Sequence, residues 1–138
     1  MFERLVPNMM VQDVQNTVKF YRDLLGFTFV MAVPKGEQGV CMEMPQDKTL
    51  IYALVKSDNI EIMFQTKESL SEDILAFKGT NIGASVSFYF YVDNISALYD
   101  GLKEKVEVVK PLHNTWYGMR EFYIKDCNGY ILGFSQKI

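Results

Sequence analysis

The sequence repeats one arrangement of segments twice, and this repetition restricts the fold more than any other feature. "VQDV" at residues 11–14 and "VDNI" at residues 92–95 lie 81 positions apart, and each comes directly before a helical pattern. In each half, one strand pattern precedes the helix and three follow it. We therefore expect an α+β protein built from two tandem βαβββ modules.

Apolar periodicity gives the approximate limits of the elements. Helical spacing covers residues 16–25, where Asp13 is the expected N-cap, and residues 95–106, where Asp93 or Asn94 would be the cap. Strand patterns cover residues 5–11, 27–33, 50–55, 60–66, 85–92, 106–109, 120–125 and 130–136.

The length and composition indicate a single domain with a substantial core. The chain has 138 residues, of which 49% are hydrophobic. We divide it into module one at residues 1–66, a connector at 67–82 and module two at 83–138. Apolar residues in the connector predict a short helix or an ordered linker.

Charge and cysteine usage exclude several classes of partner. The formal net charge of −3 comes without a basic stripe, so we expect no binding of nucleic acid. No apolar run is long enough to cross a membrane, and residues 1–7 lack a signal-peptide pattern. Cys41 and Cys127 share no metal-binding spacing. We therefore expect a cytoplasmic protein with reduced thiols.

Two strands carry an apolar face and a mixed polar face. In residues 85–92, Ser87, Tyr89 and Tyr91 alternate with apolar residues, and in residues 60–66 Glu61 and Met63 do the same. Large aromatic and thioether groups favour a ligand cavity over a solvated sheet face. A subunit interface would produce the same pattern.

Two segments resemble a known family. "VPNMMVQDVQNTVKFYRDLLGF" at 6–27 and "WYGMREFYIKDCNGYILGF" at 116–134 are similar to the two ends of the glyoxalase/bleomycin-resistance/extradiol dioxygenase domain, the vicinal oxygen chelate superfamily. The resemblance implies paired βαβββ modules whose curved mixed sheets enclose a cleft. We also expect a homodimer.

The resemblance implies up to four metal ligands, usually His or Glu, on the first and last strands of each module. The matching positions in this sequence are Val6, Glu61, Ser87 and Gly133. Only Glu61 is a useful ligand, and a catalytic divalent ion needs about three. We therefore expect no metal and no other cofactor.

Metal-free members of this family include bleomycin-resistance proteins, which sequester a flat cationic drug between aromatic and acidic groups. We accordingly expect the chain to bind a small aromatic or cationic molecule, with antibiotic sequestration as one form of this function. Glu61 is the best catalytic candidate if a reaction occurs. His113, the only histidine, is expected in an exposed loop. The expected ligand-binding residues are Asn8, Glu61, Met63, Ser87, Tyr89, Tyr91, Trp116 and Glu121.

Two other functions remain open. One is a metal-dependent lyase, isomerase or dioxygenase whose metal is held by Glu61 together with ligands at positions other than those matched above. The other is a non-catalytic sensor or interaction module that uses its tyrosine-rich face as a protein interface.

Overall fold

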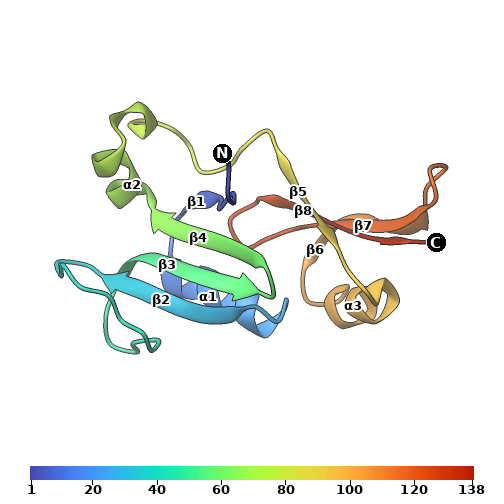
Figure 1. The fold of residues 1–138 in the computed structure, drawn as a ribbon, viewed down its shortest axis with the longest axis horizontal. Helices are drawn as coiled ribbons and strands as arrows, with labels where there is room; N and C mark the ends of the chain where they lie inside the picture. The colour runs from blue at the N-terminus through green and yellow to red at the C-terminus, as the bar shows by residue number, and fades with distance from the viewer. The chain divides into compact units, whose positions relative to one another are not determined.

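The computed structural model describes residues 1–138, which divide into two compact units at residues 1–82 and 83–138. Each unit contains one βαβββ arrangement (Figure 1). From here on, module one means residues 1–82, with the connector included, and module two means residues 83–138. Module one contains β1 (Asn8–Val11), α1 (Val14–Asp23), β2 (Thr28–Pro34), β3 (Leu50–Ser57), β4 (Ile60–Thr66), α2 (Lys67–Asp73) and the 3-10 turn η1 (Leu75–Phe77). Module two contains β5 (Ser87–Tyr91), α3 (Ile95–Leu102), β6 (Glu107–Asn114), β7 (Met119–Lys125) and β8 (Ile131–Lys137).

The two sheets have the same topology. Their strand orders are β1-β4-β3-β2 in module one and β5-β8-β7-β6 in module two. The first strand of each module pairs in parallel with the last, and the other pairs are antiparallel. The predicted α+β fold of two tandem modules with mixed sheets is therefore confirmed.

In module one, α1 covers one face of the sheet. Asp13 caps the helix as predicted, because its carboxylate accepts a hydrogen bond of 2.9 Å from the backbone N–H of Asn16. The buried ring of Tyr21 packs against Phe64 and Phe27, with ring centroids 4.8 and 5.7 Å away. These aromatic contacts fix the helix on the sheet and leave the opposite face free of it.

In module two, α3 covers the corresponding face. The Asn94 side chain caps α3 by accepting from the backbone N–H of Ala97. Tyr99 of α3 meets Phe122 of β7 edge-on, and Phe122 stacks on Phe134 of β8. Because side chains alternate along a strand, residues 119, 121 and 123 of β7 lie on the face away from α3.

The largest departure from the predicted elements is β6, which continues to Asn114 instead of ending near residue 109. His113 therefore lies in a strand, where it pairs with Glu121, and not in the expected loop. Pro111 weakens the strand pattern in the sequence, and the pairing with β7 shifts register on both sides of Lys110. Such an irregular edge strand leaves little alternation to detect.

The helix limits differ by smaller amounts. The first helix begins at Val14, immediately after its cap, and the second ends at Leu102 instead of residue 106. The connector forms α2 and η1, and α2 contacts β1 and β4 of module one. No helix in the structure is both long and apolar enough to span a bilayer.

Candidate functional site

The face of the module two sheet that α3 does not cover brings together the tyrosines and one glutamate. Strand register places Tyr89, Gly133 and Tyr123 in one row, and Tyr91, Ser135 and Glu121 in the next. We call this surface the tyrosine face. Ser87 lies on the same face further along β5, where it pairs with Ile131.

Glu121 is the centre of this surface. It is only 2% exposed, although its side chain is ionisable. The Tyr117 hydroxyl donates to the carboxylate, 2.9 Å from each oxygen, and the Tyr89 hydroxyl donates to Oε2. His113 Nε2 lies 3.9 Å from Oε1, and no lysine or arginine is within ion-pair distance. Neutral hydroxyls therefore provide the hydrogen bonds that stabilise this buried carboxylate.

The carboxylate also changes the ionisation of the tyrosines around it. Burial, followed by the hydrogen bond to Glu121, raises the pKa of Tyr89 to about 12. Tyr89 as a whole is 37% exposed, but its hydroxyl is turned toward the buried carboxylate, which explains the effect of burial. The hydrogen bond to Glu121 raises the pKa of Tyr117, and burial raises that of Tyr123. These hydroxyls therefore remain neutral donors at physiological pH.

The aromatic rings around Glu121 are open to solvent. Tyr91 is 75% exposed and meets Tyr89 edge-on, with centroids 5.4 Å apart. Trp116, in the turn between β6 and β7, is 94% exposed and meets Tyr117 edge-on. Gly118 closes this turn with a positive φ of 84°. The tyrosine face thus combines accessible aromatic surface with one buried negative charge.

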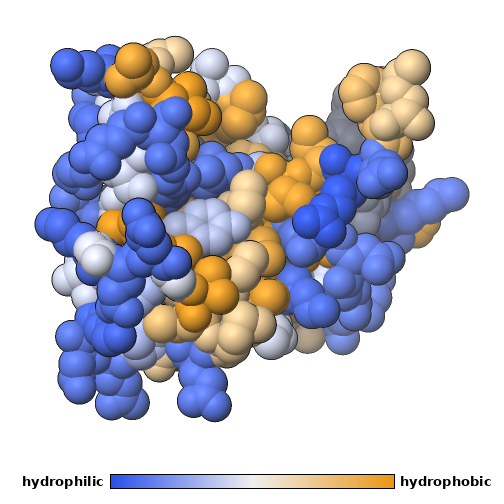
Figure 2. All heavy atoms as spheres, turned by 60° about the vertical axis from the view of Figure 1, so that its left-hand side comes forward, coloured by the Kyte–Doolittle hydropathy of each residue, from blue (hydrophilic) through white to orange (hydrophobic).

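Exposed apolar residues alone do not distinguish this surface. Figure 2 shows one side of the molecule, where hydrophobic residues form patches among hydrophilic ones. Module one also has exposed large apolar side chains. They include Val40, Met42, Ile74, Leu75 and Phe77. The distinguishing feature of the tyrosine face is therefore Glu121 and its hydrogen bonds.

Gly133 occupies one of the four positions at which the resemblance implies a metal ligand. A Cβ atom at this residue would lie 2.5 Å from Cε2 of Tyr123, so the tyrosine ring fills the space of a side chain. Val6 has no donor atom in its side chain, and Ser87 has only a neutral hydroxyl. The residues at these positions therefore do not fit a catalytic divalent ion. No group of three His, Cys, Asp or Glu residues elsewhere in the structure could hold one.

Glu61, the expected catalytic candidate, has a different environment in module one. It forms an ion pair of 3.1 Å with Arg4, and the two side chains are 22% and 70% exposed. Tyr52 lies close enough for the Glu61 charge to contribute, after burial, to raising the pKa of its hydroxyl. Glu61 is thus partly solvated and paired with an arginine, and its catalytic role stays a prediction.

Asn8 and Met63 are neighbours across the parallel pair β1 and β4, as their expected common site requires. The Asn8 amide is engaged, however, because its Nδ2 donates to Oε1 of Gln65 at 2.9 Å. Gln65 is buried and donates in turn to Ser69 and Asp73 of α2, at 2.9 and 2.6 Å. This network ties α2 to the sheet, which gives Asn8 a structural role.

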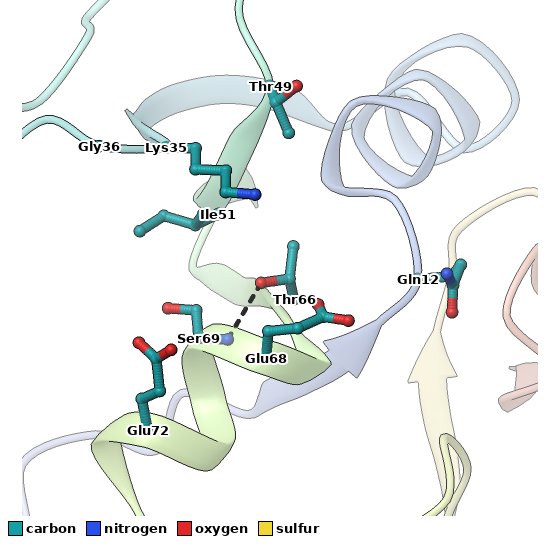
Figure 3. A pocket seen from close by; sticks show the side chains of 9 residues that line it. All are labelled: Gln12, Lys35, Gly36, Thr49, Ile51, Thr66, Glu68, Ser69 and Glu72. Carbon is teal, nitrogen blue, oxygen red and sulfur yellow. Dashed lines mark hydrogen bonds between the residues drawn. The ribbon is translucent and has the colours of Figure 1, made fainter.

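Module one also contains a hollow of about 290 Å³ (Figure 3). Lys35 lies directly after β2, and Glu68 and Glu72 come from α2. Hydroxyl groups of Thr49, Thr66 and Ser69 complete much of the lining, and Thr66 already accepts from the backbone N–H of Ser69. Its mixed charges and lack of aromatic rings make it a poorer site for a flat ligand than the tyrosine face.

Comparison with known proteins identifies a family. Residues 4–134 match the model of the Glyoxalase/Bleomycin resistance protein/Dioxygenase superfamily. Among curated proteins, none matches this sequence.

Solved structures resemble the chain over nearly its whole length. A protein of unknown function from Agrobacterium tumefaciens has 20% identity and a TM-score of 0.75, covering 100% of this chain and 96% of its own. A glyoxalase/bleomycin resistance protein/dioxygenase family enzyme from Burkholderia phytofirmans has 15% identity and a TM-score of 0.73, with coverages of 96% and 97%. TioX from Micromonospora sp. ML1 has 14% identity and a TM-score of 0.67, with coverages of 99% and 100%. At these identities the likeness concerns the fold.

Proposed function

The chain belongs to the glyoxalase/bleomycin resistance protein/dioxygenase superfamily, and from this premise we propose that it binds a small aromatic or cationic molecule without a metal. The tyrosine face of module two is the proposed binding surface. Sequestration of an aromatic antibiotic is the form of this function that we propose to test first.

One observation carries this proposal: Glu121 is buried, yet it is stabilised by neutral hydroxyls and has no lysine or arginine partner. Such a carboxylate retains a negative potential that attracts a cation. The exposed rings of Tyr91 and Trp116 supply surfaces on which a planar group can stack. A ligand that is both cationic and planar would interact with the Glu121 carboxylate and also stack on these rings.

The donor set argues against the metal-dependent lyase, isomerase or dioxygenase. Glu61 is paired with Arg4, and the ring of Tyr123 fills the space over Gly133. A metal centre at the four matched positions would need ligands that this chain does not have there. We therefore favour binding over metal-dependent catalysis.

The proposal can be tested by calorimetric titration with bleomycin and a panel of planar aromatic antibiotics. We expect at least one of them to bind at micromolar concentration, and expression of the protein to protect a susceptible host against that compound. A panel without measurable heat or protection would overturn the sequestration form of the proposal.

Exposed Tyr91 and Trp116 also favour a second candidate, an interaction module that forms a homodimer. Sedimentation analysis of the wild type and of a Tyr91→Ala, Trp116→Ala double variant tests it. A dimer that dissociates in the double variant supports an interface on this surface. A dimer that persists, or a monomeric wild type, excludes it.

A further inference from the structure

His113 is oriented by its own strand. Its Nδ1 lies 2.7 Å from the backbone carbonyl oxygen of Pro111, and a carbonyl can only accept. Nδ1 therefore carries the proton and donates. In the neutral imidazole, this tautomer leaves Nε2 as an acceptor.

This second nitrogen points toward another acceptor. Nε2 of His113 lies 3.9 Å from Oε1 of Glu121, too far for a direct hydrogen bond. The hydroxyls of Tyr89 and Tyr117 each have one proton, and both donate to the carboxylate. Neither is available to fill the gap between His113 and Glu121.

A single nitrogen with two N–H groups can bridge such a pair. Two hydrogen bonds of about 2.9 Å from one atom can reach acceptors up to roughly 5 Å apart. The Glu121 carboxylate favours a positively charged donor. The His113 side chain is 27% exposed and that of Glu121 only 3%, so a ligand would approach from the His113 side. The Tyr117 hydroxyl lies 2.9 Å from the same oxygen, Oε1, so its ring is the nearest candidate to contact an aromatic group on the ligand.

We propose that Glu121 and His113 form a subsite for a primary or secondary ammonium group that is linked to an aromatic ring through a saturated carbon, as in benzylamine. One N–H donates to the Glu121 carboxylate and another to Nε2 of His113. A quaternary ammonium has no N–H and cannot make this bridge. The inference rests on the proposed binding function, but it restricts the ligand to cations that donate hydrogen bonds.

Two matched probes test the subsite in the full chain. Benzylamine and benzyltrimethylammonium have the same ring and charge, but only benzylamine carries N–H donors. Both are titrated into the ¹⁵N-labelled protein at about pH 8, above the range in which histidines commonly titrate. We expect benzylamine to bind at least tenfold more tightly and to shift the amide signals of residues 113, 117 and 121.

Two variants complete the test. Glu121→Gln keeps the shape of the side chain but removes its charge, and His113→Phe removes the Nε2 acceptor. We expect each to reduce the preference for benzylamine to within about twofold, and an amide spectrum like that of the wild type verifies the fold. The comparison of probes on the wild type does not depend on either variant.

The possible failures are distinguishable. Equal binding of both probes at the tyrosine face overturns the ammonium subsite and leaves the proposed binding function intact. Binding of neither probe at millimolar concentration, together with no binding of the antibiotic panel, overturns both. A preference for benzylamine that survives in His113→Phe shows that the bridge is absent.

Discussion

The two modules share one fold but hold their carboxylates differently. In module one, Glu61 is partly solvated and paired with Arg4, whereas in module two Glu121 is buried among Tyr89, Tyr117 and His113. The first arrangement neutralises the negative charge. The second provides hydroxyl dipoles and no arginine or lysine, so the carboxylate keeps its negative potential. The proposed binding of a cation rests on this difference between two similar sheet faces.

The largest expected effect comes from adding a side chain at Gly133. In Gly133→Ala the new Cβ must displace the Tyr123 ring, so we expect a loss of about 2 to 3 kcal/mol in the free energy of unfolding. Urea denaturation measures it. Gly101→Ala is the matched control, because nothing lies within 4 Å of its added Cβ and alanine favours the helix. An equal loss in both variants would contradict the role assigned to the Tyr123 ring.

The next largest effect concerns the hydroxyl of Tyr89. Tyr89→Phe removes a donor from the buried carboxylate, so we expect a loss of about 1 to 2 kcal/mol in unfolding free energy. Tyr91→Phe, on the same strand and largely exposed, should stay within about 0.5 kcal/mol. Thermal and chemical denaturation of both variants measure the difference. If both behave alike, the hydrogen bond to Glu121 has no measurable effect on stability.

Alkaline pH should produce a smaller effect. Because the pKa of Tyr89 is raised to about 12 in the folded chain, the folded state keeps a proton that the unfolded state loses near pH 10. The contribution of the Tyr89 proton to the free energy of unfolding is therefore fully present below pH 10 and declines as the pH rises toward 12. Partial exposure of Tyr89 limits the contribution to under about 1 kcal/mol. Ultraviolet titration should show tyrosines that ionise above the usual range, and the latest phase, assigned to Tyr89, should move to lower pH in Glu121→Gln.

The smallest effect is expected in module one. Arg4→Ala removes the partner of Glu61, but the arginine side chain is 70% exposed. Unfolding free energy should change by no more than about 0.5 kcal/mol. A loss comparable to that of Tyr89→Phe would remove the contrast between the two carboxylates. Denaturation of the two variants in parallel, at the same salt concentration, makes the comparison.

Much of the fold follows from patterns in the sequence. Alternation in residues 85–92 placed Ser87, Tyr89 and Tyr91 on one sheet face, because side-chain direction in a regular strand depends only on parity. The segments at 11–14 and 92–95 located both helix caps, since a capping side chain acts on the backbone a few residues away. Local rules were sufficient in these cases.

Which residues surround Glu121 could not be predicted from the sequence. His113 reaches Glu121 because β6 continues beyond Pro111 through two register shifts, which no simple period encodes. Tyr117 is not among the expected ligand-binding residues, yet from the β6–β7 turn its hydroxyl donates to the Glu121 carboxylate. The hydrogen bonds of Gln65 were not predicted either. Its partners are Asn8 on β1 and Ser69 and Asp73 on α2, all outside its own strand. The assignment of the ligand-binding residues themselves stays a prediction.

The most direct test of the account compares the two carboxylates as binding groups. Proflavine, a fluorescent planar aromatic cation with N–H donors, is titrated into the wild type, Glu121→Gln and Glu61→Gln. We expect Glu121→Gln to weaken proflavine binding at least tenfold and Glu61→Gln to change it by less than twofold. Weaker binding in Glu61→Gln with unchanged binding in Glu121→Gln would contradict this expectation.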